Sequence, residues 1–142
     1  MENERKNHEL EEVVRVCRRA GTLLSESLWE YWPAVGKLEL AERNLSLHFG
    51  VALWERGFRL YAEAHPDEHP DRHLDLFAYN PITGTQVFCE FKRARDSKAF
   101  PEMEADLERI LEFRPRSSLP GARFGVIGCL SWQPELAEWW VK

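Results

Sequence analysis

The sequence lacks the features that mark membrane, secreted and disulfide-built proteins. It has no run of about 18 apolar residues, so we expect no transmembrane helix and no membrane partner. The stretch from Met1 to Lys6 is polar and contains no apolar signal segment, which argues against secretion and favours the cytoplasm. Cysteine is scarce: Cys17, Cys89 and Cys129 lie far apart in apolar surroundings, which indicates buried, reduced thiols without a zinc-binding spacing.

An excess of positive charge is also missing, because the formal net charge is −5 at pH 7. This excludes a protein that coats nucleic acid through its bulk charge. A local basic surface beside an acidic site remains compatible with this net charge. Any interaction with nucleic acid must therefore rest on local charge. The length of 142 residues suits one domain with a substantial core, and we expect a single domain over residues 1–142.

Apolar spacing predicts two helices, three strands, a helix, a strand and a last helix. The helices are expected at residues 8–32, 37–56, 100–114 and 134–141, and the strands at 58–64, 72–79, 85–92 and 123–130. The three consecutive strands favour a meander, after which a helix crosses over to the fourth strand. The predicted fold is therefore of the α/β (α+β) class, a central mixed four-stranded sheet flanked by helices in the order α-α-β-β-β-α-β-α.

The second and third strands carry charge in positions where charge is costly. Asp75 interrupts the apolar run of the second strand, and Glu90 and Lys92 flank Phe91 in the third. An ionised carboxylate inside such a strand requires a partner or a metal. The loop between the strands, residues 80–84, contains Asn, Pro and Gly at positions that suit a turn, so the two strands are expected to form a hairpin.

Symmetric pairing about this turn sets Asp75 directly opposite Glu90, at about 5 Å between Cβ atoms. Lys92 follows two residues later and lies on the same face, whereas a bulge at Gly84 would shift the register. Two bare carboxylates placed in this way repel each other, and a divalent cation between them removes the repulsion. Because oxygen ligands favour a hard ion, the pattern predicts Mg²⁺ or Mn²⁺ bound by Asp75 and Glu90, with the backbone carbonyl of Phe91 as a further ligand.

Two other features admit both a functional and a structural interpretation. Glu42 lies on the apolar stripe of the helix predicted at 37–56, so it either faces the site or reaches solvent from the edge of the stripe. The repeated His-Pro-Asp segment contains His65, His69 and His73. It forms either a metal-binding loop or a polar loop shaped by proline and aspartate turns, and we favour the polar loop.

Asp75, fourteen intervening residues and then Glu90-Phe91-Lys92 resemble the signature of the PD-(D/E)xK nuclease superfamily. That superfamily includes many restriction enzymes, junction resolvases and repair nucleases. The expected element order is similar to its restriction endonuclease-like core over about residues 38–130, with the helix at 8–32 packed on it. The resemblance implies that Asp75 and Glu90 bind the metal and that Lys92 serves the attacking water or the transition state.

The resemblance extends beyond the triplet but is incomplete. Many members of the superfamily have an additional acidic residue on the preceding helix, which Glu42 resembles. The resemblance therefore implies Glu42 as a fourth catalytic residue and metal ligand, with Glu63, late in the first strand, ranked after it as a ligand. Leu74 stands where the family often has proline, and the helix at 100–114 offers no polar motif residue that we can assign.

The sequence thus predicts a Mg²⁺- or Mn²⁺-dependent nuclease that hydrolyses phosphodiester bonds in nucleic acid, DNA rather than RNA. Arg93, Arg95 and Lys98 follow the triplet and either contact the nucleic-acid backbone or form a solvated loop. A chain of this size has little room for a recognition domain, so a homodimer or a partner protein is expected to assist. Two alternatives are a catalytically inactive nuclease-like module that binds nucleic acid or protein, and an unrelated α+β protein with a surface Glu90–Lys92 ion pair.

Overall fold

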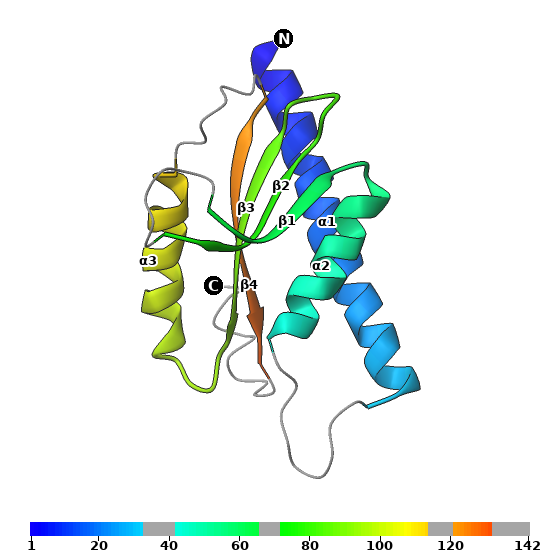
Figure 1. Cartoon of the computed structure of the whole chain (residues 1–142), viewed down its shortest axis with the longest axis vertical. Coiled ribbons are helices and arrows are strands. Elements are labelled where there is room, and N and C mark those ends of the chain that lie inside the picture. The colour runs from blue at the N-terminus through cyan, green and yellow to red at the C-terminus, as the bar shows by residue number, and fades with distance from the viewer. Residues whose placement is uncertain (33–41, 66–71, 114–120, 132–142) are drawn as a thin grey trace.

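The computed structural model describes residues 1–32, 42–65, 72–113 and 121–131. Its elements are α1 (Glu2–Glu30), α2 (Arg43–Glu55), β1 (Arg59–Ala64), β2 (Leu74–Tyr79), β3 (Gln86–Arg93), α3 (Ala99–Leu111) and β4 (Arg123–Leu130). The strands form one sheet in the order β1-β2-β3-β4, in which only β3 and β4 are parallel. Helices α1 and α2 cover one face of the sheet and α3 covers the other (Figure 1). The α+β class and the order of these elements are confirmed, while the last predicted helix lies outside the described residues.

Apolar side chains fill the space on both faces of the sheet, because residues alternate between the faces along each strand. On the side of α1 and α2, one cluster joins the helices to the sheet through Val13, Val16, Ala20, Phe49, Ala52, Leu53, Phe58, Leu76, Ala78, Val87, Cys89 and Phe91. On the other side, Phe88 packs with Ile110 of α3 and with Phe113. Strand β3 is therefore buried on both faces, which explains its unbroken apolar run.

The β2–β3 ladder has the predicted symmetric register. Its pairs are Leu76–Cys89, Phe77–Phe88, Ala78–Val87 and Tyr79–Gln86. The N–H of Gly84 donates to the carbonyl of Asn80 at 2.8 Å, and the φ of Gly84 is 76°, a conformation that suits glycine. The turn therefore closes without shifting the ladder, and one further step of the same register sets Asp75 opposite Glu90.

The helix boundaries differ from the prediction. Helix α1 begins at Glu2 instead of residue 8, because its polar first turn consists of good helix formers and carries Glu2 and Glu4, which stabilise a helix N-terminus. Helix α2 begins at Arg43, so Glu42 is an exposed N-cap residue and does not lie on the core-facing stripe; residues 37–41 lie outside the described part. No helix in the described residues is long and apolar enough to cross a membrane.

The cysteines are only partly buried. All three are free thiols: Cys89 is buried and Cys129 is half-buried, but Cys17 is exposed. The prediction of buried thiols is therefore wrong for Cys17. Its neighbour Val16 points into the core, and consecutive helical residues face different directions, so Cys17 is turned outward.

A buried carboxylate fastens α1 to the sheet. Glu9 is only 5% exposed, and its carboxylate accepts hydrogen bonds from the Thr85 hydroxyl at 3.0 Å and from the Ala122 N–H at 3.1 Å. The Arg5 guanidinium lies 3.2 Å from the same carboxylate and supplies the opposite charge. Helix α1 is thereby joined both to the start of β3 and to the segment that leads into β4.

Candidate functional site

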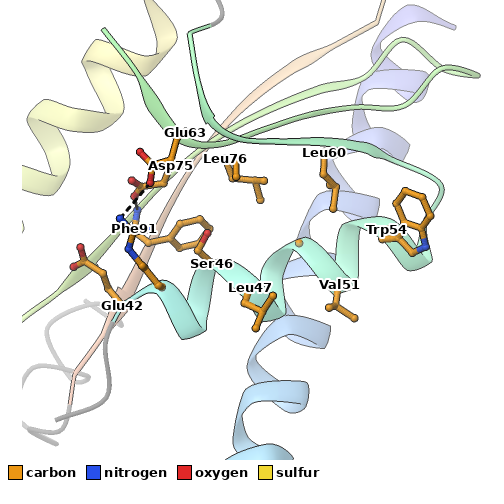
Figure 2. A pocket seen from close by; sticks show the side chains of 13 residues that line it. Glu42, Ser46, Leu47, Val51, Trp54, Leu60, Glu63, Asp75, Leu76 and Phe91 are labelled. Carbon is orange, nitrogen blue, oxygen red and sulfur yellow. Dashed lines mark hydrogen bonds and ion pairs between the residues drawn. The ribbon is translucent and has the colours of Figure 1, made fainter. Parts of the chain in front are cut away.

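Strand β3 continues beyond the end of the β2–β3 ladder, and carboxylates cap the backbone groups that it exposes there. The N–H of Phe91 donates to Oδ2 of Asp75 at 2.7 Å, and the N–H of Arg93 donates to Oε2 of Glu42 at 3.1 Å. Because the N–H and C=O of one strand residue point to the same side, the carbonyl of Phe91 lies at this edge as well. Figure 2 shows Asp75 and Glu42 converging on the backbone beside Phe91.

Glu63 reaches the same end of the sheet from β1. Its φ of 49° is a left-handed conformation, which residues other than glycine rarely adopt, and the β1–β2 ladder skips this residue. The Glu63 carboxylate lies 3.7 Å from the guanidinium of Arg43 and 3.8 Å from the ring of His73. The backbone distortion brings Glu63 to the cavity that Glu42 and Asp75 also line, as Figure 2 shows.

Glu90 is buried beside α3, with 9% of its surface exposed. Burial raises the pKa of Glu90 to about 7, and the charge of the nearby Asp75 carboxylate adds to the rise. The Arg109 guanidinium donates a hydrogen bond to Glu90 Oε1 at 2.9 Å, which opposes this shift in the pKa. Asp75 and Glu90 are therefore close enough to act on each other, as their places in the register require.

Lys92 makes an ion pair with a residue of α3. Its Nζ lies 2.9 Å from Oδ2 of Asp106, and this hydrogen bond is the main reason that the pKa of Lys92 is raised. The Arg109 guanidinium lies 3.3 Å from the other oxygen of Asp106. Glu90, Arg109, Asp106 and Lys92 thus form one chain of alternating charges, in which Lys92 stays protonated.

Asp106 and Arg109 were not among the site residues predicted from the sequence. The signal for Asp106 was present, because it follows the buried Met103 by three residues and precedes the buried Ile110 by four. It therefore lies on the apolar face of α3, the same placement that singled out Glu42. Arg109 carries no comparable signal, since an arginine three residues from an aspartate is ordinary on an exposed helix.

The remaining predicted residues lie around this site or away from it. Lys98 occupies the N-cap position of α3, and Arg95 lies in the segment between β3 and α3. In the histidine segment, Nδ1 of His65 donates to the carbonyl of Arg72 at 2.9 Å, and His69 lies outside the described residues. The part of the chain that the structure describes contains no group of three His, Cys, Asp or Glu side chains arranged to hold a metal.

The donor set beside Phe91 nevertheless fits a hard divalent cation in its chemistry. Asp75 and Glu90 are a partly desolvated pair of carboxylates, and their repulsion is one cause of the raised pKa of Glu90. A cation between them would relieve that repulsion, and the Phe91 carbonyl at the same edge would supply a third oxygen. Such a site combines two side chains with one backbone group.

An open cavity of about 560 Å³ extends from the carboxylates between α2 and β1 (Figure 2). Its acidic end is formed by Glu42, Glu63 and Asp75. The rest of its wall is mainly apolar and is formed by Arg43, Ser46, Leu47, Gly50, Val51, Trp54, Leu60, Ala62, Leu76 and Phe91. The cavity therefore joins an acidic site to an apolar channel.

Fold and site together define an α+β protein with an acidic centre at the end of its central strand. No family model matches the chain, and no curated protein matches it. Among solved structures, it is similar to a protein of unknown function from Silicibacter pomeroyi, at 23% identity and a TM-score of 0.35. The similarity covers 53% of this chain and 43% of that chain.

Proposed function

We propose that this chain is a nuclease of the PD-(D/E)xK type that uses Mg²⁺ or Mn²⁺ and cleaves DNA rather than RNA in the cytoplasm. The observation that carries the proposal is the pair formed by the half-buried Asp75 and the buried Glu90, with Lys92 two residues further along β3. A structural sheet gains nothing from two opposed carboxylates. The pKa of Glu90 is raised to about 7, first by burial and then by the charge of Asp75. Such perturbed carboxylates gather at catalytic centres.

Each residue of the site has a role that its surroundings support. Asp75, Glu90 and the Phe91 carbonyl would hold the cation, which would supply Lewis acidity to water and to the phosphate oxygens. The hydrogen bond to Asp106 raises the pKa of Lys92 and so keeps it charged, which suits it to neutralise charge that builds on the phosphate and not to act as the general base. Glu42 accepts a hydrogen bond from the N–H of Arg93, two residues after Phe91 on β3, and adds a further carboxylate beside the site.

The surroundings of the centre supply contacts for the substrate and for partners. Arg93, Arg95 and Lys98 follow the site in sequence, and we assign them to the phosphate backbone of the nucleic acid. The exposed Trp29 and Tyr31, at 92% and 76% exposure, stand at the end of α1 and offer a surface to a second copy or to a partner protein.

A second function has one observation in its favour. The ion pairs of Glu90 with Arg109 and of Lys92 with Asp106, both at 2.9 Å, balance the charges of the site without a cation. A protein of this fold that has lost catalytic activity can retain its charged site residues through such ion pairs. It can then act as a module that binds nucleic acid or protein. Arg109 therefore competes with the cation for Glu90, and the two functions make opposite predictions for cation binding.

The test is incubation of the protein with single-stranded, duplex and branched DNA and with RNA, in Mg²⁺ or Mn²⁺. Asp75→Asn and Lys92→Ala are expected to lose cleavage by about 100-fold or more, since each removes a group that acts on the transition state. Glu104→Gln, at an exposed position of α3, is the control and is expected to cleave as the wild type does. Cleavage that persists in both site variants would refute the site. A wild type that neither cleaves nor binds the cation in calorimetry would favour the binding module.

A further inference from the structure

The apolar part of the cavity is larger than chemistry on a phosphate requires. We propose that it holds an unstacked nucleobase, so that the substrate is single-stranded or locally unpaired nucleic acid. This inference rests on the proposed function, because it takes the carboxylate end of the cavity as the place where the phosphodiester is cleaved. It adds a subsite on α2 and β1 that neither the nuclease signature nor the acidic centre implies.

The cavity has the size and the walls of a site for a small planar ligand. Its volume of about 560 Å³ lies within the range of about 300–1,000 Å³ that is usual for such sites. Leu47, Val51 and Trp54 line it from α2 at a helical spacing of four and three residues, and they remain 64%, 42% and 61% exposed. Three neighbouring apolar side chains left uncovered in this way indicate a surface that binds something. Leu60 faces them from β1, as Figure 2 shows.

The charges at the two ends of the cavity suit a nucleotide chain. At the end away from Asp75, the Arg59 guanidinium lies 5.9 Å from the centre of the Trp54 ring. It is placed to meet the phosphate that follows a base stacked on Trp54. At the other end, Arg43 stands beside Glu63 at 3.7 Å, and Asp75 marks the cleavage site. Positive charge at the Arg59 end, carboxylates that meet phosphate through a divalent cation at the other end, and apolar surface between them suit a base flanked by two phosphates.

The geometry favours single strands over duplex. In a duplex each base is stacked on its neighbours and paired, so it reaches a cavity between a helix and a strand only after it is flipped out, at a cost. A base in a single strand is available without that cost, and aromatic side chains accept any base because every base has a π face. Because the acidic end repels phosphate, binding of the strand is expected to require a divalent cation.

The test is fluorescence anisotropy with a labelled thymidine oligonucleotide and with a duplex of equal length. Ca²⁺ replaces Mg²⁺, and a gel checks that the probe stays intact. The wild type is expected to bind the single strand at least about 10-fold more tightly than the duplex. Trp54→Ala is expected to weaken single-strand binding about 5- to 150-fold, the factor that corresponds to about 1–3 kcal/mol of stacking on one base. Trp54→Phe, which keeps an aromatic face, is expected to retain most of the affinity.

Ile82→Ala is the control, because Ile82 is an apolar residue that is 92% exposed in the loop between β2 and β3 and does not line the cavity. Circular dichroism melts verify that each variant is folded. Equal affinity for duplex, or a Trp54→Ala variant that binds as the wild type does, overturns the subsite. A cationic apolar peptide that binds in a Trp54-dependent manner while the oligonucleotide does not bind also overturns it, and identifies a protein partner instead.

The proposed nucleobase subsite and the proposed nuclease activity are contradicted by different experimental results. Cleavage of single strands at an unchanged rate by Trp54→Ala removes the subsite and leaves the nuclease. Single-strand binding that depends on Trp54, without cleavage in any metal, removes the nuclease and leaves a nucleobase site on a binding module. Measuring binding and cleavage with the same oligonucleotide separates these outcomes.

Discussion

Ionisation of the buried Glu90 is expected to make the protein less stable as the pH rises, and Glu90→Gln is expected to remove that dependence. The pKa of Glu90 is raised from 4.5 to about 7 in the folded protein. The folded chain therefore keeps a proton that the unfolded chain has already lost. The resulting stabilisation is complete below about pH 4.5 and is lost as the pH rises through about 7. The difference corresponds to about 3 kcal/mol, at about 1.4 kcal/mol for each pH unit.

The measurement is urea unfolding of the wild type and of Glu90→Gln at several values between about pH 5 and pH 8, in the presence of EDTA. Other carboxylates contribute equally to both proteins, so the difference in the free energy of unfolding isolates Glu90. The wild type is expected to lose about 2.5 kcal/mol relative to the variant across this range. Glu104→Gln, at an exposed position of α3, is expected to follow the wild type.

A difference between wild type and Glu90→Gln that stays constant over the whole range would refute the reasoning, because Glu90 would then titrate alike in both states. The same titration with Mg²⁺ or Mn²⁺ tests the cation. A ligand that binds only the folded state stabilises it, so at pH 8 the cation is expected to raise the stability of the wild type and not that of Glu90→Gln. Ionised Glu90 destabilises the folded protein when the cation is absent, and ionised Glu90 is also the form that binds the cation.

Two further predictions concern packing and the buried carboxylate of α1. Gly128→Ala is expected to lower the free energy of unfolding by about 1–3 kcal/mol, because an added Cβ collides with the Phe91 ring. Gly21→Ala, whose Cβ meets nothing within 4 Å, is expected to raise it by about 0.5–1 kcal/mol. Thermal melts compare the two, and a fully tolerated Gly128→Ala would contradict the close contact. Glu9→Ala is expected to cost about 2–3 kcal/mol, because it leaves two donors unpaired. Glu26→Ala, exposed on the same helix, is its control, and equal melting of the two would contradict the role of Glu9.

The parts of the fold that follow from local chemistry were predictable. The turn residues between β2 and β3 fix the register, and the register alone sets Asp75 against Glu90. The order of the elements follows from the period of the apolar residues. These features depend on neighbours in the sequence, so no knowledge of the tertiary structure was needed.

The parts that depend on distant contacts were not predictable. Glu42 was expected to reach the site from the apolar face of a helix, and it reaches the strand edge from an exposed N-cap. The partners of Glu90 and Lys92 lie on α3, and their identity depends on how that helix crosses the sheet. The left-handed backbone of Glu63 has no signature in the sequence, because only the surrounding packing determines it.

The hydrogen bond between Glu9 and Ala122 has a consequence for the folding kinetics. It joins residues that are 113 positions apart. Helix α1 and the segment before β4 must therefore dock against each other before this bond can stabilise either of them. Closing so long a loop costs entropy before any contact repays it, and chains dominated by such contacts fold slowly. The hairpin and α3, which need only nearby partners, can form earlier. We therefore expect the docking of α1 to be a late step and Glu9→Ala to speed unfolding more than it slows folding.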